Sequence, residues 1–255
     1  MATYFRSVPG SGTYTTIVPR NVFNTTGANA IQYAPTIGVI DGTSSSDVGS
    51  SDVGGVQGGT ASYTSSLLRA GLLMGLETTA KLYRNSVIGL TTGAVAGGAT
   101  NITVPSQVAT EVARLITVAG GNITLTIIGP TSTGIPIGAN TETLTVSAAT
   151  GTTMTVTATA HAYVVGSLIQ PADGSQAPLT LLTGQYGVDV ADQNGSRLNQ
   201  GLWPGVLIKA DLISAMIPCM ISDDFGNTTE PSCTSYLQTQ LRAQGSQFTF
   251  ATTRV

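Results

Sequence analysis

Apolar and hydroxyl side chains alternate with a period of two along two stretches of this chain, residues 122–128 (NITLTII) and 142–158 (ETLTVSAATGTTMTVTA). The apolar positions of the two stretches are Ile123, Leu125, Ile127, Leu144, Val146, Met154, Val156 and Ala158. Because successive side chains of a strand point to opposite faces of a sheet, this period predicts half-buried β-strands. The second stretch is interrupted at Ala148–Gly151, which predicts a hairpin.

The composition agrees with a β-rich fold. The 255 residues include 40 threonines, and the β-branched hydroxyl side chain of threonine suits a pleated, half-hydrated surface. Charged residues make up only 9% of the chain, whereas ordinary soluble domains contain about 25%. A chain of this length forms one large β domain or two smaller ones, and it is long enough to bury a sizeable core.

A helix is predicted between a short strand at residues 101–104 and the alternating stretches. Four apolar residues within QVATEVARLITVAGG share one face at helical spacing, and Gly120-Gly121 supplies the stop. These four residues are Val108, Val112, Leu115 and Ile116. Together with the predicted hairpin, the helix defines an inserted α+β lobe at residues 96–178.

The edges of this lobe lack the usual protection against pairing with other strands. Between Leu115 and Ala172 the only formally charged residue is Glu142, although exposed sheet edges are usually guarded by charges, proline or bulges. Either the preceding part of the chain covers the edges, or a neighbouring subunit does. The third interpretation is that edges coated with threonine simply remain soluble.

Two segments of dense hydrophobic residues broken by glycine flank the lobe, at residues 64–95 and 179–222. In the first segment we predict strands at 71–77, 82–83 and 87–91, with turns at 78–81 and 84–86. The second segment contains matching stretches, TLLTGQYGVDVA (180–191) and GLWPGVLIKADLI (201–213). The two segments are therefore predicted to form one β-barrel or sandwich core.

The two ends of the chain lack the dense hydrophobic stretches of the segments between them. Residues 1–63 sustain neither a strand period nor a helix period and are predicted to form an extended amino-terminal arm. Within the arm, the serine- and glycine-rich stretch 43–60 is predicted to be a flexible hinge that makes few contacts. Residues 223–255 form a tail with a predicted short helix near Thr234–Ala243, followed by either a terminal edge strand or a docking peptide.

No motif predicts an enzyme, a cofactor or a metal. The single histidine, His161, has no nucleophile elbow to serve and is predicted to be a structural or surface residue. Cys219 and Cys233 have no ligands at metal-binding spacing and are predicted to be two unpaired thiols, with a late disulfide as the alternative. The acidic stretch at 223–230 is predicted to be a turn. The remaining acidic residues considered for acid–base work stand alone in the sequence, so only the fold could bring a pair together: Glu142, Asp189, Asp192 and Asp211.

Charge and hydropathy also bear on binding partners. The net charge is −3 and the ten basic residues are scattered singly, so we predict no direct binding to nucleic acid. No stretch has the 18 or more apolar residues in a row that span a bilayer, and MATYFRSVPGSG lacks the apolar run of a signal peptide. We therefore expect no membrane partner, and synthesis and folding in the cytoplasm.

Two stretches, LRAGLLMGLETTAKLYRNSVIG (68–89) and GSLIQPADGSQAPLTLLTGQYGVDV (166–190), resemble the head decoration proteins, or capsid cement proteins, of tailed bacteriophages. The sequence ETLTVSAATGTTMTVTATAHAYVVGSLI also resembles a β-hairpin module that is frequent in phage structural proteins. One departure is at Ala80, where the pattern TxxGKY would have glycine. The long inserted lobe is a second departure.

The resemblance implies a structural virion protein on the capsid exterior, assembled in the host cytoplasm. It implies that the chain binds the major capsid protein and neighbouring copies of itself, with a trimer favoured. We expect the arm to contribute the capsid contacts through aromatic and branched residues. The predicted anchors are Tyr4, Phe5, Ile17, Val18, Val22, Phe23 and Tyr33.

Two alternatives remain open at this stage. A phage tail or fibre-attachment protein can be equally rich in threonine and β structure. A carbohydrate-binding or depolymerase module would need exposed aromatic residues or paired carboxylates, and the single tryptophan, Trp203, gives it little support.

Overall fold

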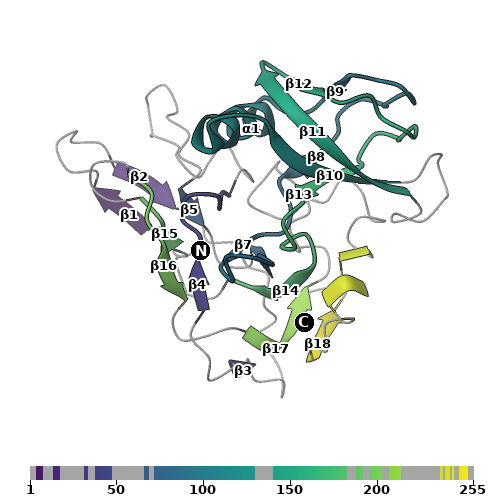
Figure 1. Cartoon of the computed structure of the whole chain (residues 1–255). Helices are drawn as coiled ribbons and strands as arrows, with labels where there is room; N and C mark the ends of the chain where they lie inside the picture. The colour runs from purple at the N-terminus through teal and green to yellow at the C-terminus, as the bar shows by residue number, and fades with distance from the viewer. Residues whose placement is uncertain are drawn as a thin grey trace.

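The computed structural model describes residues 4–7, 14–17, 32–33, 38–47, 66–68, 72–129, 140–182, 188–191, 196–202, 207–213, 236–237, 239–241, 243 and 247–251. Over these residues the chain is mainly β, with curled antiparallel sheets that form a half-barrel (Figure 1). The predicted fold class is confirmed.

The largest described sheet has six antiparallel strands in the order β8-β13-β10-β11-β12-β9. The bounds of these strands are β8 Gly89–Leu90, β9 Asn101–Thr103, β10 Ile123–Gly129, β11 Asn140–Thr150, β12 Thr153–Val156 and β13 Leu168–Pro171. The register pairs Leu125 with Leu144 and Ile102 with Met154. Pairs directly opposite share one face of a sheet, so these apolar side chains form one continuous surface.

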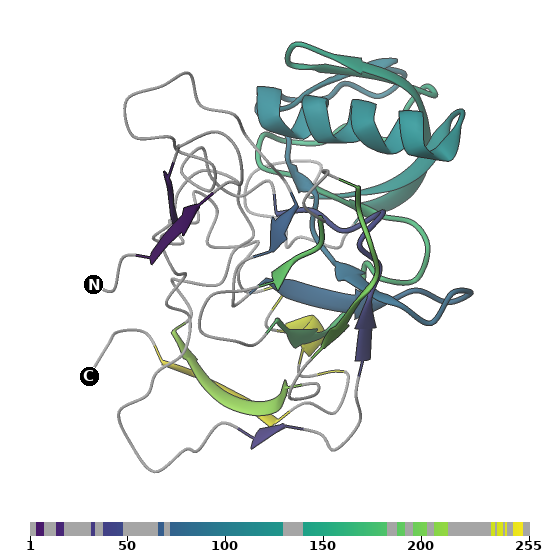
Figure 2. The same cartoon turned by 90° about the vertical axis from the view of Figure 1, so that its left-hand side faces the viewer.

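Helix α1, Ser106–Ala119, covers that surface (Figure 2). Its residues Val108, Val112 and Leu115 are buried in a core shared with the inward side chains of β9 to β12. The helix ends at Gly120, whose φ of 66° is left-handed and whose N–H donates to the Thr117 carbonyl. Glycine adopts this conformation without steric cost, so the predicted helix and its stop are confirmed.

The predicted half-buried alternation holds for β11 and β12 but is incomplete for β10. Thr126, expected on the wet face, is 5% exposed, and Ile128 on the same face is 3% exposed. Thr126 pairs with Gln170 of β13, and the Gln170 side-chain amide donates to the carbonyls of Ser86 and Gln176. At this end the second face of the sheet is therefore covered by the rest of the chain. Ala158, predicted to be inward, is exposed beyond the end of β12.

A second sheet has the order β14-β6-β7-β4-β16. Its strands are β4 Gly38–Ile40, β6 Leu73–Leu76, β7 Tyr83–Asn85, β14 Pro178–Leu181 and β16 Gln200–Leu202. Strands of the two flanking hydrophobic segments therefore lie in one sheet, together with β4 from the segment predicted to be an arm. A separate core lies beneath it and contains Ile40, Leu68, Leu72, Met74, Leu182 and Val190.

The predicted turn at 84–86 is wrong, because Arg84 and Asn85 belong to β7. Both side chains look like turn residues in the sequence, but their polar groups, except Arg84 Nε, have partners inside the fold. Arg84 pairs with Asp173, and Asn85 accepts from the Ser46 N–H and donates to the Val87 carbonyl. The turn predicted at 78–81 is confirmed, and it ends at Lys81 with a φ of 57°.

The remaining described strands form small sheets. These are β1 Tyr4–Ser7 with β2 Tyr14–Ile17, β5 Leu67–Leu68 with β15 Val188–Asp189, and the order β18-β17-β3 for Gln247–Ala251, Leu207–Ile213 and Gln32–Tyr33. The predicted tail helix is confirmed, since Leu237 and Leu241 lie in helical turns and are fully buried. The chain then ends in an edge strand, β18, which runs parallel to β17.

The two edges of the six-stranded sheet are treated differently. Both residues of β8, which comes from the first hydrophobic segment, are buried. At the other edge Asn101 and Thr103 are exposed, although the Thr103 carbonyl accepts from the Thr92 N–H. One edge is thus covered by the chain itself, and the other carries an uncharged polar coat.

The same substitution, valine to alanine, can be made at a buried and at an exposed position of α1 to test the core packing. Val112 is fully buried and Val118 is 48% exposed. We expect Val112→Ala to lower the free energy of unfolding by about 2 kcal/mol, because it leaves a cavity. Val118→Ala should change it by less than about 0.5 kcal/mol. Urea unfolding followed by circular dichroism measures both values, and equal effects would mean that α1 does not pack on the sheet as described.

Candidate functional site

The most connected polar part of the described chain is the segment Asp41–Asp47, called the strap here, which follows β4. Its first turn is organised by one carboxylate. The N–H groups of Thr43 and Ser44 donate to Asp41 Oδ1 at 2.8 and 3.2 Å, and the Ser45 N–H donates to the Asp41 carbonyl at 2.9 Å. Aspartate followed by glycine, threonine and serine favours this kind of turn, because the short side chain can bond to the backbone just ahead of it.

Three consecutive carbonyls of the strap accept hydrogen bonds from three arginines. Arg114 Nη1 donates to Thr43 O at 2.8 Å, and Arg84 Nη2 donates to Ser44 O at 3.1 Å. Arg197 Nη1 donates to Ser45 O at 2.7 Å. The three side chains come from α1, from β7 and from the segment before β16. The strap therefore connects the helical lobe to the five-stranded sheet.

Two of the three arginines are themselves fixed by carboxylates. Arg114 pairs with Glu111, one helical turn earlier, and Glu111 is only 2% exposed. Arg84 Nη1 pairs with Asp173 Oδ2 at 2.7 Å. A guanidinium held in this way is pre-organised to donate its remaining N–H groups to a carbonyl. The strap is bound by rigid donors rather than by mobile surface side chains.

The strap is also enclosed. Ser45, Ser46 and Asp47 are at most 1% exposed, and the Ser46 N–H donates to Asn85 Oδ1 at 2.9 Å. A Cβ atom on Gly42 would overlap the backbone carbonyl of Leu198. The predicted hinge is therefore wrong for residues 43–47, because hydrogen bonds within the protein hold their backbone, although Thr43 itself is exposed. Residues 48–60 lie outside the described residues.

Two acidic side chains meet beside the strap. Asp41 and Glu77 are each 8% exposed, and their carboxyls share a hydrogen bond. Burial, together with the hydrogen bond to Asp41 and the negative charges of Asp41 and Asp173, raises the pKa of Glu77 to about 7, against a smaller opposing effect of Arg84. The fold thus forms the carboxyl pair that the sequence alone did not reveal.

The pKa values of the other two carboxyls move in the opposite direction. Burial alone would raise the pKa of Asp41, but hydrogen bonds from Ser44, Glu77 and Thr43 hold it below its ordinary value. The pKa of Asp173 is likewise lowered despite burial, through Arg84 and hydrogen bonds from Ser175. At neutral pH, Glu77 is therefore the group in this cluster that exchanges its proton.

The Asp41–Glu77 pair is enclosed by the protein's own chain. A protonated Glu77 beside an ionised Asp41 could in principle serve as an acid–base pair. Both groups are more than nine-tenths buried, however, and they face the protein's own strap. Within the described ranges no group of three or more His, Cys, Asp or Glu residues could hold a metal ion.

The structure does not bring the predicted anchors together into one described surface. Tyr4 and Phe5 lie in β1, Ile17 lies opposite Tyr4 in β2, and Tyr33 lies in β3 beside β17. Val18, Val22 and Phe23 lie outside the described residues. The anchor assignment stays a prediction.

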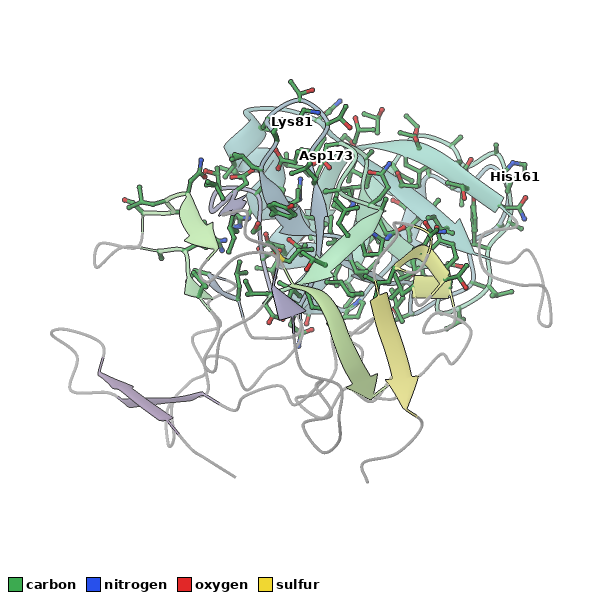
Figure 3. All side chains as sticks on the ribbon, turned by 90° about the horizontal axis from the view of Figure 1, so that it is seen from below. Lys81, His161 and Asp173 are labelled. Atoms are coloured by element: carbon green, nitrogen blue, oxygen red, sulfur yellow. The ribbon has the colours of Figure 1, made fainter. Side chains whose placement is uncertain are left out.

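The other singled-out residues that the structure describes lie apart from one another. His161 is exposed, and Figure 3 places it at one edge of the body, away from Lys81 and Asp173. Glu142 accepts the Ala160 N–H at 2.7 Å. Asp189 lies in β15 and Asp211 in β17. The residues outside the described ranges are Asp192, Trp203, Cys219, Cys233 and the acidic stretch 223–230.

Sequence inspection missed Asp41, Glu77 and Asp173. Two short motifs could have revealed the aspartates, because each predicts a turn in which the aspartate side chain bonds to the backbone just ahead of it. These motifs are Asp-Gly-Thr-Ser at 41–44 and Asp-Gly-Ser at 173–175. No such signal marked Glu77, because its partner lies on a different strand of the sheet. Only the parallel pairing of β4 with β7 and the antiparallel pairing of β6 with β7 bring them together.

Comparisons with known proteins give no further guide. No family model matches the chain, and neither a known protein nor a solved structure matches it significantly. In the described part of the chain, no helix is both long enough and apolar enough to cross a membrane.

Replacing Gly42 tests how closely the strap is held. Gly42→Ala places a methyl group against the Leu198 backbone, which must move, so we expect it to lower the free energy of unfolding by at least about 2 kcal/mol. Gly121→Ala is the control, because a Cβ there meets nothing within 4 Å. It should change stability by less than about 0.5 kcal/mol. Chemical denaturation gives both numbers, and a neutral Gly42→Ala would contradict the enclosed strap.

Proposed function

We propose that this chain is a structural virion protein that binds the outside of a phage capsid and stabilises it by bridging neighbouring major capsid subunits. The proposal rests on one observation. The two stretches that resemble head decoration proteins, 68–89 and 166–190, lie far apart in the sequence but pair with each other in the fold. Strand β14 pairs with β6, β15 pairs with β5, and β13 pairs with β8.

Surface chemistry supports the proposal further. Exposed positions of β9, β11 and β12 carry threonine, serine, alanine and asparagine, with no charged side chain among them. Such a surface binds through shape and hydrogen bonds instead of long-range charge. A decoration protein gains from this because many copies engage one shell at once, so multivalency compensates for a modest affinity at each site.

The rival functions need different features. A carbohydrate-binding module would need exposed aromatic rings for sugar stacking, yet Tyr163 is 2% exposed and Tyr83 and Tyr236 are partly buried. These are the aromatic side chains whose burial the structure describes. A phage tail or fibre-attachment protein agrees equally well with the fold, so it remains the second candidate.

Copy number separates the two candidates. Purified particles of the phage that encodes this chain should carry hundreds of copies per head if it decorates the capsid. A tail or fibre component should be present in a dozen copies or fewer. Quantitative mass spectrometry against the major capsid protein gives the ratio, and the lower number would refute the decoration function.

Truncation tests the role of the arm. Residues 2–31 can be removed without touching β3 or β4, whereas a deletion that reaches Asp41 would remove a strand of the five-stranded sheet and the start of the strap. If the arm contacts the capsid, the truncated protein, which lacks β1 and β2, should still unfold cooperatively but bind expanded empty heads at least about tenfold more weakly. Unchanged occupancy would show that the arm is not the capsid contact.

A further inference from the structure

The carboxyls of Asp41 and Glu77 can form their hydrogen bond only if one of them carries a proton. An ionised carboxylate is an acceptor only, so two carboxylates in contact repel each other. Each residue is 8% exposed, which leaves little water to screen that repulsion. The pair in the described arrangement therefore holds one shared proton.

Neighbouring charges do not remove the need for this proton. Arg84 directs Nη1 to Asp173 and Nη2 to the Ser44 carbonyl, and Asp173 adds a further negative charge near Glu77. Lys81, in the turn after Glu77, is exposed. Tyr83 of β7 stays neutral, because burial raises its pKa above the ordinary value. A second negative charge on the pair would be poorly compensated.

The carboxyl of Asp41 also organises the strap. Its Oδ1 accepts the N–H groups of Thr43 and Ser44, and this turn directs the carbonyls of residues 43–45 to Arg114, Arg84 and Arg197. Repulsion from an ionised Glu77 would act on the same carboxyl that holds the turn. The state of one proton is thus coupled to seven residues of backbone that join the two sheets.

We propose that the strap is a pH-operated latch, which is held closed while Asp41 and Glu77 share a proton and loosens when both are ionised. Loosening would free the strap carbonyls and the three arginines that bind them, without unfolding the sheets. This inference does not rest on the proposed function. In a capsid protein, this latch would make the connection between the two sheets less stable in mildly alkaline than in mildly acidic solution.

The direction of the pH dependence follows from the pKa values. The pKa of Glu77 is about 7 in the fold, above its ordinary value of 4.5. The stability that the shared proton gives the strap is therefore fully present below pH 4.5 and is lost as the pH rises through 7. Asp41 and Asp173 have lowered pKa values. The stability that their ionised carboxylates contribute is therefore lost only at acid pH, below their ordinary pKa of 3.8. The latch should be firmest between these limits, in mildly acidic solution.

Hydrogen exchange on the intact protein tests the proposal directly. The amides of Thr43, Ser44, Ser45 and Ser46 all donate to acceptors that opening of the strap would remove. After correction for intrinsic exchange, their protection in the wild-type protein should fall about tenfold between pH 6 and pH 8. Glu77→Gln keeps a donor for Asp41 but has no proton to lose. Its protection at pH 8 should therefore equal that of the wild type at pH 6.

Two further variants make the outcome decisive. Asp41→Asn retains an oxygen for the strap amides and removes the like charge, so it should also abolish the change between pH 6 and pH 8, even if Glu77→Gln fails to fold. Glu142→Gln makes the same chemical change in the helical lobe and should keep the wild-type response. A wild-type change of less than about twofold, or an undiminished change in Asp41→Asn, would overturn the latch.

Discussion

The strap at Asp41–Asp47 is the connection on which the described architecture depends. Three of the chain's eight arginines donate to three consecutive carbonyls, and each arginine comes from a different part of the chain. A hydrogen bond to a charged donor contributes roughly 1.5–3 kcal/mol. Three such bonds are of the same order as the net stability of a typical domain, about 5–15 kcal/mol. One of these bonds, from Arg114 of α1, joins the helical lobe to the five-stranded sheet, and the other two hold the strap against that sheet itself.

The strap also explains how two separate cores become one structure. The core beneath α1 and the core around Ile40 and Met74 are distinct clusters. Their junction contains polar groups, including Arg84, Asn85 and Gln170, which bond mainly to backbone atoms. Buried polar networks of this kind favour one arrangement over others, although Arg84 Nε and Gln170 Oε1 have no hydrogen-bond partner in this one. The orientation of the sheets is thus specified by hydrogen bonds, while the apolar cores supply most of the burial.

The elements built on apolar periodicity could be predicted from the sequence, whereas those built on long-range hydrogen bonds could not. Helix α1, the hairpin of β11 and β12 and the tail helix were predictable, because each is encoded by local periodicity and by a local stop such as Gly120. The strap was not, since its serines and aspartates have the composition of a solvated hinge. Contacts with residues distant in the sequence, such as Arg84, Asn85 and Arg197, enclose them. The turn predicted at 84–86 was wrong for the same reason. Arg84 and Asn85 are polar residues within strand β7, and their partners are distant in the sequence. The Asp41–Glu77 pair depends on strand order, which periodicity does not encode.

The central claim is that the strap makes the two sheets a single cooperative unit. Native-state hydrogen exchange as a function of urea tests it, by comparing the slowest amides of β10 in the six-stranded sheet with those of β6 in the five-stranded sheet. If the strap couples the sheets, both sets should exchange through openings with the same free energy and the same urea dependence. Two well-separated free energies, each with its own smaller urea dependence, would show that the sheets unfold independently and would contradict this account.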